Sequence, residues 1–471
     1  MHTSRSHITS RRARAACLTM LLAAAPLAAQ GTPAPSSPAA VPSAAASPLV
    51  LGELYREARQ ASPRGEAARA LARAAEARVP GARRPPDPEL QLGFMNYTLP
   101  GLRPMEPLGM TQLQLMQMLP TAGKLGLSGR VAAAQAAAQS ERATEVGWEV
   151  RNDVAMAFYD LYQTEQTLEV DRRTLRLVQD IRQTAEAMYR VGEGRQADVL
   201  RANVEIARMV EDTIRMATMR TAMAARLAAL LDRPADSPVG SPALPEFPDS
   251  VPELATLLAQ AADGRAMVKA GQREVEAAEA QSTLARREIW PDLTVGIQYG
   301  QSRVTMPAGT DAEGMPMPAE RRTERMGSLM VGATLPIFAR SRQLRMREEM
   351  TAMRRMAEAD LASMRAETRG GVAQAHANLL RARRLAALYR TTVIPQAEAT
   401  VQSSLAAYRV GSVDFMTLLD NRMAVNEYQQ QLLALEAEEG KAWAELEMLV
   451  GRELLDANSV AAGRAVAGGA R

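Results

Sequence analysis

Few residues of this chain have types and spacings that could carry out chemistry. Beyond the first 29 residues, His376 is the only histidine, and it lies in an alanine-rich stretch that is helical in composition. The sequence contains no glycine-rich phosphate loop, no Cys/His metal spacing and no pairing of a nucleophile with a base. We therefore expect no enzyme and no cofactor, and we expect His376 to lie on a helix surface or in a helix seam.

Methionine is the remaining residue type that could bind a ligand, with 27 in the chain. Two groups stand out: Met306, Met315, Met317 and Met326 in or beside the segment 301–326, and Met346, Met350, Met353 and Met356 at helical spacing. Thioethers are soft ligands that suit Cu(I), so copper or silver export is one hypothesis, with Met306, Met315 and Met317 as candidate contacts. We favour a structural interpretation, because isoleucine is scarce and methionine is a good helix former and gap-filler.

The elements that must position these side chains occur twice. Tyr189-Arg190-Val191-Gly192 and Tyr408-Arg409-Val410-Gly411 lie 219 positions apart. The same offset relates two sets of mostly apolar residues, here called ladders, whose positions alternate in steps of three and four. The first ladder is Val199, Ala202, Ile206, Met209, Thr213, Met216, Arg220, Met223, Leu227 and Leu230. The second is Leu418, Asn421, Val425, Tyr428, Leu432, Leu435, Glu439, Ala442, Leu446 and Leu449. Such steps are typical of a coiled-coil seam. We infer one duplicated segment, each repeat a long helical hairpin bent at Tyr-Arg-Val-Gly.

Composition fits a duplicated, elongated helical body. The chain has 471 residues, of which 47% are hydrophobic but only 4% aromatic. A compact core of this size usually carries more Phe and Trp, whereas long helices that bury narrow Leu/Ala/Met seams need fewer. Duplication favours two similar halves over unrelated modules.

The first residues predict a secretory signal. A basic stretch with Arg5, Arg11, Arg12 and Arg14 precedes an apolar run at 15–27 that is too short to span a bilayer. Cleavage near Ala29 removes the only cysteine and four arginines, leaving 56 − 4 = 52 basic against 53 acidic residues. The basic pI therefore belongs to the leader, and we expect no nucleic-acid partner. No later stretch of about 20 apolar residues predicts a transmembrane helix.

Periodicity and breakers predict the remaining elements in order. The helices expected are 49–82 with a break near Ser62-Pro63, 124–189, a return helix to 231, 253–288, 340–407 with an interruption at Pro395, and a return helix ending near Gly451. The strands expected are 89–97, 111–118, 293–299 and 329–335, the last two separated by a loop at about 301–326. The domains are a signal peptide at 1–29, a Pro/Ala/Ser-rich linker at 30–48, repeat 1 at 49–231, a linker at 232–252, repeat 2 at 253–451 and a disordered tail at 452–471.

Four strands in two hairpins, each roughly nine to eleven residues long, have the length of tilted membrane-spanning strands. Four strands cannot close a barrel, and an open edge in lipid leaves backbone groups unpaired at several kcal/mol each. If these strands lie in a membrane, several chains must share one barrel. The alternative is a soluble β-layer that caps a helical domain. The export signal and helices of roughly 100 Å favour the membrane, because such helices reach across a periplasm.

With these features, the sequence resembles the TolC-like outer-membrane efflux proteins, including their heavy-metal-exporter branch. The resemblance covers 49–451 and rests on the duplicated helix–hairpin–long-helix order, on Leu119-Pro120 and Leu335-Pro336 after strands, and on the Tyr-x-Val-Gly turns. It implies a mainly α fold with a β-barrel part: a homotrimeric tunnel with four transmembrane strands per chain. It also implies an outer-membrane exit duct whose helical part lies in the periplasm, where it works with an adaptor and an inner-membrane pump of the RND type.

The resemblance also assigns roles to single residues. The turn residues Tyr189, Arg190, Val191, Gly192, Gly194, Arg409, Val410 and Gly411 match the hairpin tips where an adaptor docks. Tyr408 matches a tyrosine at the constriction, and Asp420 matches one of two acidic residues that ring the entrance. The other acidic position is Thr417 here, and an expected arginine is Val413, so the gating hydrogen bonds of the family cannot be carried over whole. Asp198 and Asp414 are further candidates for the constriction.

Other interpretations remain, both for single residues and for the whole chain. Asp198 and Asp414 lie near the starts of return helices, where acidic side chains cap the helix and favour its dipole. For the whole chain, the alternative to an exit duct is a periplasmic adaptor or another structural coiled-coil protein of an export machine. Adaptors carry one helical hairpin inserted in a small β-domain, whereas this sequence predicts two.

Overall fold

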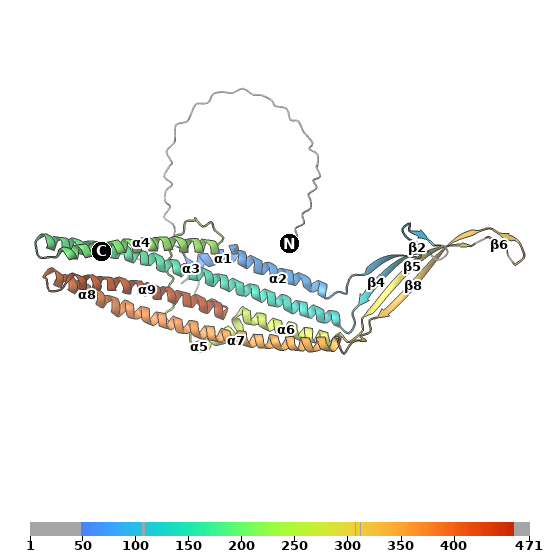
Figure 1. Ribbon diagram of the computed structural model, residues 1–471. Coiled ribbons are helices and arrows are strands. Elements are labelled where there is room, and N and C mark those ends of the chain that lie inside the picture. Colours follow the sequence, from blue (N-terminus) through green and yellow to red (C-terminus); the bar gives the residue numbers. More distant parts are fainter. Residues whose placement is uncertain (1–48, 106–108, 307, 311, 456–471) are drawn as a thin grey trace, which may run out of the picture. The chain divides into compact units, whose positions relative to one another are not determined.

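The computed structural model describes residues 49–105, 109–306, 308–310 and 312–455 (Figure 1). The predicted signal peptide, the linker at 30–48 and nearly all of the predicted tail lie outside these residues. The helices are α1 (Leu51–Ala61), α2 (Pro63–Ala82), α3 (Lys124–Arg190), α4 (Gln196–Leu230), α5 (Leu254–Gly264), α6 (Ala266–Arg287), α7 (Gln343–Leu388), α8 (Ile394–Arg409) and α9 (Phe415–Val450). The strands are β1 (Glu89–Met95), β2 (Tyr97–Thr98), β3 (Arg103–Pro104), β4 (Met110–Leu119), β5 (Leu293–Met306), β6 (Gly309–Thr310), β7 (Pro316–Met317) and β8 (Glu320–Ala333).

Two long helical hairpins repeat along the chain, as the sequence predicts. Helix α3 has 67 residues and no proline, which corresponds to about 100 Å at 1.5 Å per residue. Helix α4 returns along α3, and α9 returns along α7 and α8. All twenty ladder residues are buried or half-buried, so the spacing of three and four does mark the seams. None of the described helices is long and apolar enough to cross a membrane.

Pro395 marks a change of helical geometry rather than a gap. Between α7 and α8 the backbone forms a π-helical turn at Tyr389–Val393 and then continues directly as α8. Proline lacks an N–H and its ring clashes with the carbonyl four residues earlier. A wider turn just before Pro395 accommodates both defects, so the helix continues without a break.

The helix predicted at 253–288 is wrong at Arg265, where the structure has a break between α5 and α6. Arg265 is extended, and its guanidinium donates to Glu145 at 3.1 Å and to the Thr368 hydroxyl at 2.9 Å. A Cβ on Gly264 would lie 2.3 Å from the carbonyl oxygen of Val450, so no larger residue fits. No proline signals this break. It depends on contacts with three distant helices.

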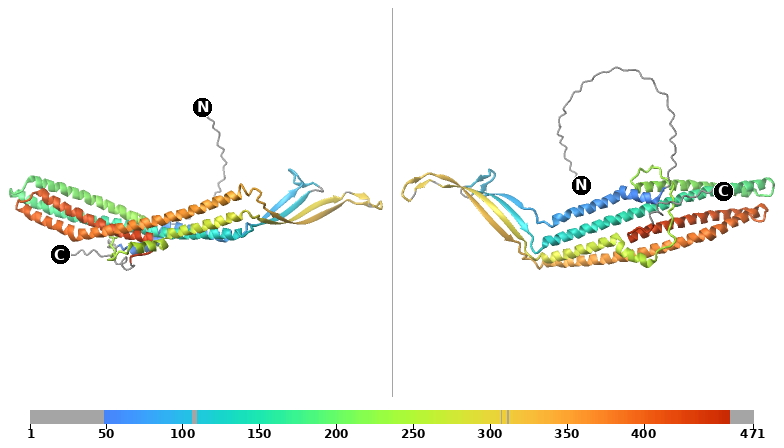
Figure 2. Two further views of the ribbon diagram at one scale, coloured as in Figure 1. Left: turned by 90° about the horizontal axis from the view of Figure 1, so that it is seen from below. Right: turned by 180° about the vertical axis from the view of Figure 1, so that it is seen from behind.

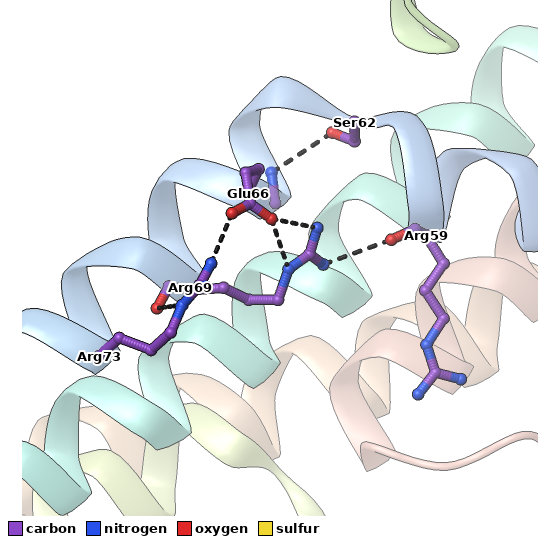
Figure 3. Close-up of polar contacts among 6 residues, drawn as sticks. Arg59, Ser62, Glu66, Arg69 and Arg73 are labelled. Atoms are coloured by element: carbon purple, nitrogen blue, oxygen red, sulfur yellow. Dashed lines mark hydrogen bonds and ion pairs between the residues drawn. The ribbon is translucent and has the colours of Figure 1, made fainter. Parts of the chain in front are cut away.

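The corresponding break in the first repeat, at Ser62-Pro63, is held by local polar contacts (Figure 3). Ser62 accepts a hydrogen bond from the backbone N–H of Gly65 and so caps α2. Glu66 accepts from Arg69 at 3.3 Å and from Arg73 at 2.5 Å, while Arg69 also donates to the carbonyl of Arg59 on α1. Hydrogen bonds from Arg69 and then Arg73 lower the pKa of the Glu66 carboxyl. The proline and these nearby polar side chains fix the junction by contacts that are local in the sequence.

The four main strands form one antiparallel sheet in the order β1-β4-β5-β8 (Figure 2). Strands β5 and β8 have 14 residues each, so the predicted lengths and the predicted loop at 301–326 are wrong. Residues 301–306 pair with 320–325, although residues 320–325 are all polar and show no alternation of apolar and polar side chains. The small ribbons β2–β3 and β6–β7 were not predicted.

One face of this sheet is apolar across all four strands. The register places Leu92 opposite Leu113, Leu113 opposite Tyr299, and Ile297 opposite Leu329. The opposite face carries glutamine and glycine, with Gln298 donating to Gln112 at 2.6 Å. In the sequence of β4 the alternation changes phase at Met116, where a second apolar residue follows Leu115, yet the pairing with β5 continues without a bulge. Gln117 therefore falls on the apolar face near the helices, where it donates to the Pro86 carbonyl at 2.6 Å.

The main core lies where α1, α3, α5, α7 and α9 meet, around Trp443, Tyr159 and Phe158. Residues 232–252, predicted as a linker, pack on this core through Leu244 and Phe247. Leu49 also pairs with this segment by a β-bridge to Pro242. The segment between the repeats is therefore part of the folded body.

Candidate functional site

Two glycine turns end the long helices at equivalent positions. Gly192 has φ 80° and Gly411 has φ 73°, a left-handed backbone that glycine adopts without strain. Each glycine N–H bonds to the carbonyl of the preceding tyrosine, Tyr189 at 3.1 Å and Tyr408 at 3.0 Å. At Gly194 a Cβ would lie 2.8 Å from the backbone nitrogen of Tyr189, so the first turn requires a second glycine. The motif seen in the sequence is thus a helix-terminating turn.

The two hairpin tips (residues 191–195 and 410–414) present apolar side chains to solvent. Val191 is 71% exposed and Val410 78% exposed, and the neighbouring Arg190 and Arg409 are also exposed. A pair of valines flanked by arginines on two adjacent turns is a surface that can pack against another protein's apolar side chains.

The two motif tyrosines differ in burial. Tyr408 is 4% exposed and Tyr189 is 45% exposed. Tyr408 packs edge-to-face on Phe415, with 5.7 Å between ring centroids, and belongs to the tip cluster, which consists of Val178, Ile181, Ala185, Ala202, Tyr408, Phe415, Leu418 and Leu419. Its hydroxyl has no hydrogen-bond partner among the described residues. Burial first, and then the charge of Asp198, raises the pKa of Tyr408. The tip cluster therefore joins both hairpins.

The acidic candidates near the tips lie in different settings. Asp414 is the N-cap of α9: it accepts from the backbone N–H of Thr417 at 3.4 Å and from the Thr417 hydroxyl. These bonds, with the Thr417 hydroxyl first, lower the pKa of Asp414. Asp198 is half-buried in the first turn of α4, close enough to Tyr408 to affect its pKa.

Asp420 lies apart from this group, exposed on α9 in a groove of about 390 Å³ between α3, α4 and α9. The groove contains three further carboxylates and three methionines: Asp171, Asp212 and Glu427, and Met209, Met216 and Met423. The structure thus brings Tyr408 and Asp198 together and places Asp420 among acidic residues that the sequence gave no reason to group.

Comparison of the sequence with models of protein families identifies the family of this chain. A family model described as "Outer membrane efflux protein" matches residues 54–233 and 257–452, one segment for each repeat. The chain belongs to the outer membrane efflux protein family. This confirms the resemblance inferred from the duplicated order. No match was found among curated protein sequences.

Solved structures of outer-membrane channels share the fold of this efflux protein. CusC has a TM-score of 0.70 at 16% identity, over 86% of this chain and 93% of CusC. VceC of Vibrio cholerae has a TM-score of 0.68 at 18% identity, over 86% and 97%. The open state of MtrE of Neisseria gonorrhoeae has a TM-score of 0.69 at 17% identity, over 86% and 89%. The predicted fold class, mainly α with a sheet of barrel type, is confirmed.

A buried polar network between α3 and α9 was missed by sequence reasoning. Thr174 donates to Asn426 at 2.7 Å and accepts from Arg422 at 3.2 Å, while Asp171 accepts from Gln430 at 2.7 Å and from Asn426 at 3.4 Å. Burial raises the pKa of Asp171 and lowers that of Arg422, which is 8% exposed and has no partner on its Nε among the described residues. The available signal was the spacing of Arg422, Asn426 and Gln430, four residues apart beside the ladder.

The remaining candidates have structural settings. His376 is half-buried, and its ring lies 3.2 Å from the Pro252 carbonyl, which holds the segment before α5. Met315 and Met317 are exposed on the β6–β7 ribbon, and the side chain of Met306 lies outside the described residues. The described residues contain no group of three or more His, Cys, Asp or Glu that could hold a metal ion. Copper export stays a prediction.

Proposed function

We propose that this efflux protein is the exit duct of a tripartite system and conducts passively what an inner-membrane pump and a periplasmic adaptor deliver. One observation carries this proposal: a four-stranded sheet with an apolar face and two open edges, attached to two helical hairpins of periplasmic length. The sheet would cross the outer membrane and the helices would extend into the periplasm. The pump would supply substrate selection, since a passive duct needs only a pore of suitable width and charge.

The open edges require other copies of the chain. In the part of the chain that the structure describes, β1 pairs only with β4 and β8 only with β5. An unpaired edge in lipid costs several kcal/mol for each unsatisfied backbone group. Within the chain, β4 of repeat 1 pairs with β5 of repeat 2. The duplication makes β8 against β1 of the partner subunit the equivalent pairing, and three subunits supply twelve strands, enough to close a barrel.

The helices support the same assembly. Helix α9 packs against α3 as well as against α7 and α8, whereas α4 packs mainly against α3 among the described elements. On the uncovered side of α4, Leu200 is 58% exposed, Val204 57% and Ile214 63%. The equivalent of Leu200 is Leu419, which is 5% exposed. We expect α7 and α8 of a neighbouring subunit to cover this face of α4, as α3 covers α9 within the chain.

The hairpin tips then form the periplasmic end of the duct. Val191 and Val410, with Arg190 and Arg409, would contact the adaptor. Tyr408, packed in the tip cluster, would hold the two hairpins together at the constriction with Asp198 nearby, and Asp414 and Thr417 would fix the start of α9. Asp420, repeated in each of three subunits, would place a carboxylate ring at the entrance that attracts cations.

Cysteine cross-linking tests the closure directly. The only cysteine of the chain is Cys17, inside the predicted signal peptide. A double variant, Leu92→Cys with Val331→Cys, places one thiol on each open edge, on the apolar face. Leu92 lies opposite Leu113 as Ile297 lies opposite Leu329, so the two thiols correspond to Ile297 and Leu115, which pair within the chain. We expect oxidation in outer-membrane fractions to give linked dimers and trimers and nothing larger.

Each single-cysteine variant is the matched control and should give no trimer. Fractionation of the wild type as a soluble periplasmic monomer would contradict the duct and favour the periplasmic adaptor. Linked ladders beyond the trimer would contradict a closed ring of three, because an open chain of subunits has no fixed length.

A further inference from the structure

The outer ends of β5 and β8 carry charge sorted by face. The two strands pair without a bulge from Leu293 opposite Ala333 to Met306 opposite Glu320. Side chains therefore alternate between the two faces along the whole length. On β5 the apolar face that contains Ile297 and Tyr299 continues into Gln301, Arg303 and Thr305. On β8 the same face continues from Leu329 into Arg325, Thr323 and Arg321.

Within the paired residues of β5 and β8, three arginines and no acidic residue thus share this face beyond the apolar band. Arg303 lies opposite Thr323, which has Arg321 and Arg325 two positions away on either side. Diagonal neighbours in a sheet lie about 7–8 Å apart, within reach of long side chains. All three arginines are exposed, and none forms an ion pair within the part of the chain that the structure describes.

The opposite face at the same level carries the acidic residues. Glu320 and Glu324 lie there with Arg322, whose guanidinium is 3.7 Å from the Glu320 carboxylate. A sheet with randomly placed surface charge would mix signs on both faces. Here the cations gather on the apolar side with no ion-pair partner among the described residues, and like charges repel unless an anion binds between them.

The distance along the strand places these arginines at a lipid headgroup level. From Leu293 to Arg303 is ten steps, or about 33 Å at about 3.3 Å per residue. With a strand tilt of about 40°, the height is about 25 Å, which matches the apolar band of outer-membrane barrels. The helices attach at the other end of the strands (Figure 1), so the arginines lie at the outer leaflet if the sheet crosses the membrane as proposed.

We propose that Arg303, Arg321 and Arg325 form a phosphate-binding site for the phosphorylated glycolipid of the outer leaflet. The inference rests on the proposed function, because it requires this face to contact lipid. A guanidinium binds phosphate oxygens through two parallel, charge-assisted hydrogen bonds, and this is why arginine suits phosphate recognition. The site would anchor the β5–β8 hairpin and could bridge to a second phosphate on the same disaccharide headgroup.

The test measures binding of purified lipid A, which carries two phosphates, to the detergent-solubilised full chain by native mass spectrometry. The variant is R303Q/R321Q/R325Q, and the matched control is R322Q, which removes one arginine from the opposite face. Each basic side chain near an anionic lipid surface contributes about a factor of five. We expect the triple variant to bind about 100-fold more weakly and R322Q to bind like the wild type.

Equal binding by the triple variant and the wild type would overturn the site, as would an equal loss in R322Q. Phosphatidylglycerol is the competing source of phosphate, and binding of it as tight as that of lipid A would also overturn the proposal. Fractionation keeps this result separate from the function: a triple variant that still forms trimers in the outer membrane leaves the duct intact. A wild type found outside that membrane refutes the duct itself.

Discussion

The return helices α4 and α9 are equivalent by duplication yet differ in what covers them. Their ladders face inward in both repeats, but the outer side of α9 is buried against α3 while that of α4 is exposed. The pair Leu419 and Leu200 shows the contrast, at 5% and 58% exposed. Duplication within one chain thus provides one repeat-to-repeat contact internally. The second contact can form only with another subunit, because the outer side of α4 stays exposed within this chain.

The difference extends to the polar residues. Arg422 and Asn426 of α9 take part in the network with α3, and their equivalents on α4 are Asn203 and Ala207. Tyr408 is buried at the tip and Tyr189 is half exposed. The two repeats keep the same turns and seams, and they diverge where each meets a different neighbour.

The largest effect should come from exchanging the residues at one equivalent pair, Gly440 and Thr221. A Cβ on Gly440 would lie 2.2 Å from the ring of Tyr159, which is fully buried. Gly440→Thr should therefore destabilise the protein by about 3 kcal/mol through overpacking. Thr221→Gly, at an exposed position of α4, should cost about 0.5 kcal/mol. Thermal unfolding of the purified assembly measures both. Similar losses in the two variants would contradict the difference in packing.

The two glycine turns have the same conformation in both repeats, so substitutions there should reduce stability by an intermediate amount that is equal at both. Gly192→Ala and Gly411→Ala each force a side chain into the left-handed region, although nothing lies within 4 Å of the added Cβ. Each should cost roughly 1–2 kcal/mol from backbone strain alone. The readout is the same unfolding measurement. If one variant were much more costly than the other, the tips would differ in conformation as well as in sequence.

The smallest effect is a pH dependence specific to the α3–α9 contact. Burial raises the pKa of Asp171 above its ordinary 3.8, so the folded state holds this proton more tightly than the unfolded chain does. The contribution of Asp171 to stability should fall as the pH rises from 3.8 through the raised value. Asp171→Asn keeps an acceptor for Asn426 and Gln430 but cannot ionise.

The measurement compares the unfolding temperatures of the wild type and Asp171→Asn between pH 4 and pH 7. The wild type should lose stability relative to the variant as the pH rises. Asp180→Asn, at an exposed position of α3, is the control and should track the wild type. If the difference in unfolding temperature between the two proteins stayed constant from pH 4 to pH 7, Asp171 would be in contact with water rather than in the network.

Much of the fold was predictable because it depends on local pattern. The ladders, the glycine turns and the proline-free run from Lys124 specify helices and their ends within short windows of sequence. The break at Arg265 was not predictable, since it depends on Glu145, Thr368 and Val450, which are distant in the chain. The outer halves of β5 and β8 were missed for a similar reason. The all-polar run 320–325 shows no alternation, so it is recognised as a strand only when it is paired with β5.

By itself the sequence determined the duplication, the long hairpins and the position of both turns, because helix seams and left-handed glycines require only neighbouring residues. The tertiary structure alone decided which equivalent surfaces are covered and which are open. It also decided that Asp171, Thr174, Arg422 and Asn426 form one network, and that Arg303, Arg321 and Arg325 share a face. Burial and register are properties of paired elements, and no single stretch of sequence contains both partners.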